Sequence, residues 1–227
     1  MLAAAEAGDT KRFISTLKYV RNINFQDEDL EETALHKAAK NGYRDIVQLL
    51  LGEAASIEVR NKENNIPLYY AAFHGHTSIV ELLLGKGASI EAITTEDFTP
   101  LHLAAYRGHT STVELLLGKG ASIEAITTGG FTPLHLAAQE GHTSTVELLL
   151  GKGASIEAIA TEDFTPLRLA AYWGHTSTVE LLLTKGASIG AINTGGFTPL
   201  EFAEEKGYTD IVQLLKYKAA ELAGGRA

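Results

Sequence analysis

Several features that mark common protein classes are missing from this 227-residue sequence. There is no cysteine, which excludes disulfides and thiolate metal sites. Acidic residues outnumber basic ones, and the formal net charge of −9 argues against a nucleic acid or an anionic membrane as the main partner. No apolar run approaches the roughly 20 residues that span a bilayer, and the opening MLAAAEAGDTKRF lacks the basic n-region of a secretion signal. We therefore expect a soluble, cytoplasmic protein.

Proline is scarce but regularly placed. Each of the five prolines lies 33 residues after the one before it: Pro67, Pro100, Pro133, Pro166 and Pro199. The tetrapeptides around them keep the same step, from TALH and IPLY through two copies of TPLH to TPLR and TPLE. A fixed period of this length is typical of a solenoid.

One repeat, residues 94–126, can be interpreted as two short helices and a loop. Thr99 and Pro100 suit the N-cap and the first position of one helix, which Gly108 ends. Thr110 is predicted to cap the second helix, and Gly120 lies just past its end, where a left-handed backbone favours glycine. Helices of about eight residues are unstable alone and bury their apolar faces against neighbouring repeats. The sequence therefore predicts an all-α stack.

The 33-residue step, the TPLH tetrapeptide, the Gly-His pairs such as 108–109 and the Gly-Ala turns resemble the ankyrin repeat family over nearly the whole chain. The resemblance implies a solenoid of helix–turn–helix units joined by β-hairpin-like fingers, with a concave groove. We expect about seven units in a single domain, 1–219. They are an N-terminal cap unit (1–32), five repeats (33–197) and a C-terminal cap unit (198–219), followed by a frayed tail (220–227).

Departures from the repeat carry information of their own. Glu204 and Lys216 replace residues that are apolar in the middle repeats, as expected of a polar cap. Ile66 replaces the threonine of TPLH, so its helix loses a hydroxyl cap. Ala54 stands where later repeats have glycine, and we expect it to be held in a left-handed conformation.

The usual signs of catalysis or cofactor binding have simpler explanations here. GKGAS at 85–89, 118–122 and 151–155 lacks the Walker spacing and follows a leucine-rich helix, which is typical of a helix C-cap. The resemblance implies that the TPLH histidines order the turn, and histidines that recur once per repeat lie too far apart to share a metal. We expect no metal, no cofactor and no catalytic residues.

Two neighbouring repeats differ only in two pairs of positions. Residues 93–112 and 126–145 share sixteen of twenty residues, while Glu96-Asp97 becomes Gly129-Gly130 and Tyr106-Arg107 becomes Gln139-Glu140. The finger pair alternates along the chain, which fits either duplication of a 66-residue block or deliberate assembly.

Synthetic binders built on the ankyrin fold are diversified at the finger and at the end of the first helix, which line the groove. Carried over by register, with nearby aromatic residues, the candidate partner-binding residues are Tyr69, Phe73, Glu96, Phe98, Tyr106, Arg107, Phe131, Gln139, Glu140, Glu162, Phe164, Tyr172 and Trp173. The ladder of Phe98, Phe131, Phe164 and Phe197 fits finger-to-finger packing and ligand contact equally well. Trp173 occupies a position that accepts Trp, His, Arg, Glu and Lys, so we expect it to lie outside the packed interior.

The sequence favours a non-enzymatic module that binds a protein partner through its groove and finger tips, as a monomer, without nucleic acid or membrane. Two alternatives within that fold are a consensus-like or engineered scaffold with no natural partner and a self-assembling module. A third, of another class, is an enzyme or nucleotide-binding protein with a hidden site.

Overall fold

The computed structural model describes residues 1–224, which form fourteen α-helices in seven consecutive pairs and no β-strand. The first six helices are α1 (Leu2–Ala7), α2 (Thr10–Leu17), α3 (Ala34–Asn41), α4 (Arg44–Gly52), α5 (Pro67–Phe73) and α6 (Thr77–Gly85). The next four are α7 (Pro100–Tyr106), α8 (Thr110–Gly118), α9 (Pro133–Gln139) and α10 (Thr143–Gly151). The last four are α11 (Pro166–Trp173), α12 (Thr176–Thr184), α13 (Pro199–Lys206) and α14 (Thr209–Gly224). The predicted all-α solenoid is confirmed.

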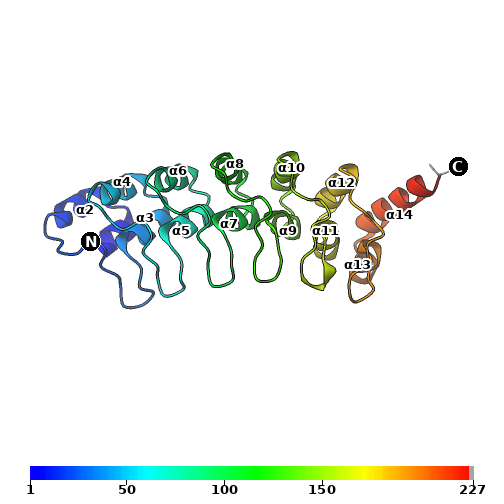
Figure 1. The fold of residues 1–227 in the computed structure, drawn as a ribbon, viewed down its shortest axis with the longest axis horizontal. Coiled ribbons are helices and arrows are strands. Elements are labelled where there is room, and N and C mark those ends of the chain that lie inside the picture. The colour runs from blue at the N-terminus through cyan, green and yellow to red at the C-terminus, as the bar shows by residue number, and fades with distance from the viewer. Residues whose placement is uncertain (225–227) are drawn as a thin grey trace. The chain divides into compact units, whose positions relative to one another are not determined.

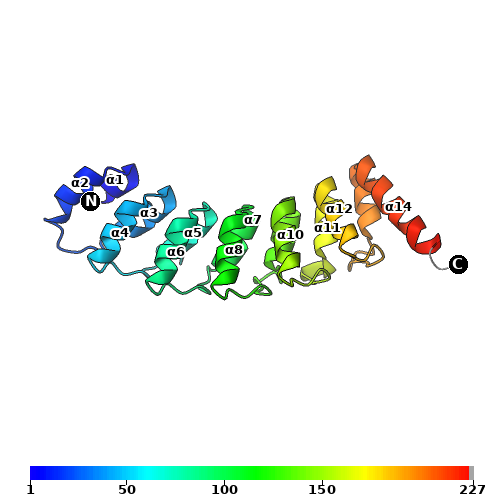
Figure 2. The same cartoon turned by 90° about the horizontal axis from the view of Figure 1, so that it is seen from above.

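The chain packs as two compact units, and their boundary falls inside α7 and α8. The first unit contains residues 1–104 and 111–122, and the second contains residues 105–110 and the chain from 123 onward. In the first unit α1, α3 and α5 pack side by side in one layer, while α2, α4 and α6 form the other (Figures 1 and 2). In the second unit α9, α11 and α13 form one layer and α10, α12 and α14 the other.

The helices begin where the sequence supplies a cap. The Thr33 hydroxyl accepts from the main-chain nitrogen of His36, and Thr132 does the same for His135. Ile66 provides no side-chain cap, as predicted, although Pro67 still begins α5. Pro occupies the first position of each such helix in the described repeats after the first two, where its fixed φ and missing N–H suit a helix start.

The second helix of each repeat begins differently from the prediction. Thr110 is the first residue of α8 and not its N-cap. Its hydroxyl lies 2.8 Å from the Thr145 hydroxyl. In the next repeat, the Thr143 and Thr178 hydroxyls form the same contact at 2.9 Å. These threonines therefore join neighbouring repeats, because Thr145 and Thr178 are buried where a hydroxyl needs a partner.

The fingers are tight loops that extend from one side of the helix layers within each unit (Figure 1). In the finger at 127–131, Thr127 N donates to Phe131 O at 3.1 Å and Gly130 N donates back to Thr127 O at 2.8 Å, which gives the hairpin-like turn. Gly130 has φ 73°, and its counterparts Asn64 and Asp97 have φ 66° and 60°. Ala54 has φ 59°, which confirms the predicted left-handed conformation.

The two ends of the chain differ. In the last pair Lys216 Nζ lies 2.7 Å from Glu204 Oε1, so the two polar replacements form an ion pair on the outer surface. The first pair instead exposes Tyr19 (85%) and Phe25 (55%). A frayed tail was expected from residue 220, whereas α14 continues to Gly224, and residues 225–227 lie outside the described part of the chain.

Candidate functional site

The candidate residues fall into two sets, one in each unit. Tyr69, Phe73, Glu96 and Phe98 belong to the first unit. The second unit contains Tyr106, Arg107, Phe131, Gln139, Glu140, Glu162, Phe164, Tyr172 and Trp173. None of the thirteen is fully buried.

The second unit carries an aromatic cluster built around Phe202. The rings of Phe164 and Phe197 stack on Phe202 with centroids 5.7 and 5.2 Å away and planes within 17° of parallel. Tyr172 meets the same ring edge-on at 5.3 Å. Phe202 is only 6% exposed, so these finger phenylalanines bury a core ring between them. Phe164 and Phe197 therefore pack on a residue of helix α13.

Tyr172 and Trp173 have different environments although they are neighbours at the end of α11. Tyr172 is half-buried, and Lys206 Nζ lies 4.7 Å from the centre of its ring, in cation–π contact. Trp173 is 52% exposed and touches Tyr172 edge-on at 5.3 Å. Trp173 is thus the large exposed aromatic of this helix end, whereas Tyr172 supports the aromatic cluster beneath it.

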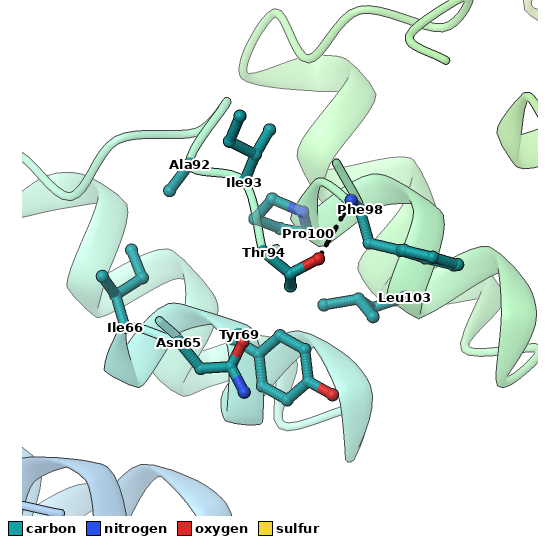
Figure 3. Close-up of a pocket in the computed structure, with 9 residues that line it drawn as sticks. All are labelled: Asn65, Ile66, Tyr69, Ala92, Ile93, Thr94, Phe98, Pro100 and Leu103. Carbon is teal, nitrogen blue, oxygen red and sulfur yellow. Dashed lines mark hydrogen bonds between the residues drawn. The ribbon is translucent and has the colours of Figure 1, made fainter. Parts of the chain in front are cut away.

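In the first unit the Tyr69 and Phe73 rings stack at 5.9 Å with planes 5° apart. Tyr70 meets Tyr69 edge-on at 5.0 Å and is itself buried. Burial and the nearby carboxylates of Glu63 and Glu96 raise the pKa of Tyr69. Figure 3 shows the Tyr69 ring beside the next finger, below Thr94 and Leu103. This half-buried aromatic face is bordered by acidic groups.

The backbone beneath the variable helix ends is held by histidines of the next repeat. His142 Nε2 donates to the main-chain oxygen of Tyr106 at 3.0 Å, and His175 Nε2 donates to that of Gln139 at 2.7 Å. The side chains at these ends are left outside the core: Arg107 is exposed, and Gln139 and Glu140 are half-buried. The Gly-His pair therefore fixes the main chain where the side chain varies.

The TPLH histidine is a structural group, as the resemblance implied. His135 Nδ1 accepts from Thr132 N at 3.1 Å, so its Nε2 carries the proton and donates to the carbonyls of Ala158 and Phe164 in the next finger. Burial lowers the pKa of His135 to about 4, so the ring is neutral at pH 7. His36 makes the same two connections, to Thr33 and to the Asn65 carbonyl.

The structure adds exposed residues that the sequence-based prediction omitted. One isoleucine in each of three successive fingers of the second unit is more than half exposed: Ile126 (62%), Ile159 (65%) and Ile192 (62%). Ile93 occupies the equivalent position in the first unit and is 43% exposed. The signal was present in the sequence, since these residues follow the same 33-residue step in a segment predicted to be a finger.

Within residues 1–224, no group of three or more His, Asp or Glu side chains is placed to hold a metal ion. Over the same range, none of the helices combines the length and apolar character that a bilayer crossing requires.

Comparison with protein families gives one match. A family model described as ankyrin repeats (3 copies) matches residues 1–94, 91–160 and 157–223. A comparison with curated proteins gives no match.

Proposed function

This chain belongs to the ankyrin repeat family, and on that basis we propose that it is a non-enzymatic module that binds a protein partner. Ankyrin repeats are generally protein–protein interaction modules. The proposed contact surface is the finger tips together with the adjoining ends of the first-layer helices. We further propose that the repeats act as a single domain, that the protein is a monomer in the cytoplasm, and that it binds neither nucleic acid nor membrane.

One observation carries the proposal: the residues that vary between nearly identical repeats are not buried in the folded protein. Glu96 and Arg107 are exposed, and their counterparts Gly129 and Glu140 are half-buried. The positions that stay the same, such as Leu101 and Leu134, are 0% and 1% exposed. Packing explains constant buried residues such as these leucines but does not require the variable ones, so we attribute the variation to contact with a partner.

The composition of the exposed positions supports a protein partner. Trp173 and Arg107 are of the residue types enriched at binding hot spots. The finger isoleucines Ile126, Ile159 and Ile192 add a recurring apolar element that water solvates poorly.

The proposal can be tested with the intact chain on an affinity matrix. Proteins retained from an extract are identified, and the strongest is purified and titrated against the chain. Trp173→Ala should weaken binding by at least 2 kcal/mol, the usual threshold for a hot spot. Glu147→Ala is the matched control, because Glu147 is an exposed residue of α10 in the other helix layer.

Equal loss in both variants would show that the retained protein binds elsewhere or nonspecifically. Binding that neither variant weakens would contradict the proposed surface. Sedimentation of the chain alone, over a range of concentrations, tests the monomer: reversible growth in mass would favour self-assembly.

A further inference from the structure

The repeat that begins at Ile66 lacks a connection that other repeats make. His36 and His135 donate from Nε2 to carbonyls of the following finger. In TPLR, Arg168 replaces the histidine and its Nε donates to the Ala191 carbonyl at 3.2 Å. Tyr69 occupies this position in IPLY. Among the described residues, no hydrogen bond joins the Tyr69 hydroxyl to the next finger.

The carbonyls left without a histidine donor are those of Ala92 and Phe98, which correspond by register to Ala158 and Phe164. Phe98 O accepts one bond, from Thr94 N at 3.2 Å, and a carbonyl oxygen has room for a second. Both residues line a small cavity together with Tyr69. The cavity therefore lies where the histidine of other repeats donates to the next finger.

A second acceptor faces the same cavity. Asn65 is 4% exposed, and its Oδ1 has no hydrogen-bond partner among the described residues. Its Nδ2 donates to Glu63 Oε2 at 3.2 Å, which fixes the orientation of the amide. Figure 3 shows the amide oxygen turned toward Thr94 and the nitrogen away from it. A buried oxygen without a hydrogen-bond partner is unfavourable, so this site favours an occupant that donates.

Three replacements create the site. Asn65 stands where later repeats have phenylalanine, Ile66 where they have threonine, and Tyr69 where the next two repeats have histidine. All three line the cavity, which encloses about 10 Å³. That volume holds one group of the size of a water molecule.

The charges around the opening favour a cation. The carboxylates of Glu63 and Glu96 act on Tyr69 strongly enough to contribute to its raised pKa. Of the two basic residues in this finger pair, Arg60 donates from Nη1 to the carbonyls of Asn64 and Ile93 at 2.8 and 3.1 Å, and Lys62 is exposed. The carboxylates of Glu63, Glu96 and Asp97 outnumber these two basic groups and leave the finger pair with a net negative charge. The surrounding Tyr69, Phe98 and Leu103 offer an apolar path for an alkyl stem.

We propose that this cavity receives the ammonium group of a lysine side chain from the bound partner, with Asn65 Oδ1 as the principal acceptor. The inference rests on the proposed function and specifies its chemistry. An ammonium is compact and presents three donors, which matches a water-sized space lined by acceptors. A guanidinium is a broad planar fork and exceeds this space.

The test uses the intact chain and n-butylammonium, which reproduces the end of a lysine side chain and needs no partner. Binding is followed by ¹H–¹⁵N NMR at the Asn65 side-chain amide and the Thr94 and Phe98 main-chain amides, at constant ionic strength. We expect saturable shifts at these groups. The probe n-butylguanidinium has the same stem and charge, and its affinity should be lower by a factor of about ten or more.

Two variants and one control complete the experiment. Asn65→Leu removes the acceptor, and Tyr69→His restores the residue that other repeats use to bond the next finger, so each should abolish saturable binding. Gln213→Leu, which replaces an exposed amide of α14 in the other unit, should leave it unchanged. If Asn65→Leu fails to fold, Tyr69→His carries the same test, because it restores the pattern of the neighbouring repeats.

Absence of saturable shifts would mean that the cavity holds only an ordered water, and it would overturn the inference. Equal binding of the guanidinium probe, or binding that survives both substitutions, would overturn it as well. The result is independent of the partner: if n-butylammonium binds here but no protein partner is found, the proposed function fails and this site stands.

Discussion

Replacing Ala160 with threonine should stabilise the finger at residues 160–164. Four other fingers have a side-chain acceptor at this position that receives a main-chain N–H group of its own loop: Asn61, Thr94, Thr127 and Asn193. In the first finger Asp27 does the same from one position earlier. Alanine supplies none. The finger instead forms a 3-10 turn, Thr161–Asp163, in which Glu162 and Asp163 both have left-handed backbones with φ 58° and 56°.

The magnitude follows from three contributions. A threonine hydroxyl accepting from Phe164 N, as Thr127 accepts from Phe131 N at 3.2 Å, contributes about 1 kcal/mol. Releasing Glu162 from the left-handed region recovers roughly 1 kcal/mol more. Against this, the rearranged finger loses the bond from Thr161 N to Gly129 O at 3.0 Å, again about 1 kcal/mol. The expected net gain is about 1 kcal/mol.

Two measurements check the gain. In a chain of this length about 1 kcal/mol raises the thermal midpoint by roughly 2–4 °C. Repeat arrays also open locally, so hydrogen exchange of the Phe164 amide is the more specific readout and should slow. Thr127→Ala is the reciprocal change: it should destabilise its own finger by about 1 kcal/mol and accelerate exchange at Phe131.

The reasoning is refuted if Ala160→Thr leaves both the midpoint and the Phe164 exchange rate unchanged while Thr127→Ala is also neutral. That result would mean that the side-chain acceptor does not determine the finger conformation. A gain in stability should also move Glu162, a proposed contact residue, so a partner that uses this finger should bind the variant with altered affinity.

Three further predictions concern single side chains. Tyr172→Ala should lower the free energy of unfolding by about 1–2 kcal/mol in chemical denaturation, because it removes half-buried packing against Phe202. Trp173→Ala should change it by less than about 0.5 kcal/mol, because Trp173 is exposed. Equal effects of the two substitutions would contradict the different roles of these residues. Ala54→Gly should raise the unfolding midpoint by the equivalent of about 0.5–1 kcal/mol, since Ala54 has φ 59°, and a lower midpoint would refute strain there. Burial lowers the pKa of His135 to about 4, below its unfolded value of about 6.5, so the folded protein binds fewer protons than the unfolded chain between these pH values. The free energy of unfolding should therefore fall by roughly 3 kcal/mol as the pH drops from about 6.5 to 4. His135→Gln should flatten that part of a plot of stability against pH.

The local structure was predictable because it depends on residues close in the sequence. Thr132 and Pro133 begin a helix through their own cap geometry, and Ala54 has a left-handed backbone because it follows a helix end as its glycine counterparts do. The 33-residue period also fixed the number of helix pairs and the all-α stack, since short amphipathic helices have only their neighbours to pack against.

The candidate site was predictable only as a set of positions. Register identified Trp173 as a residue outside the core, and its 52% exposure agrees with that. The same reasoning grouped Tyr172 with it, because sequence adjacency does not show that Tyr172 turns toward Phe202, thirty residues away. The finger isoleucines were predictable as recurring finger residues but not as exposed ones, because exposure is a property of the folded loop.

Contacts between repeats were decided by the tertiary structure alone. The pairing of Thr110 with Thr145, the 3-10 turn after Ala160 and the cavity beside Asn65 each depend on which atom of a neighbouring repeat lies opposite. A periodic sequence specifies each repeat through local capping and turn chemistry. What a buried oxygen such as Asn65 Oδ1 meets is set by packing across the repeat, because a hydrogen bond requires its two atoms to lie within about 3 Å, and no local pattern encodes that distance.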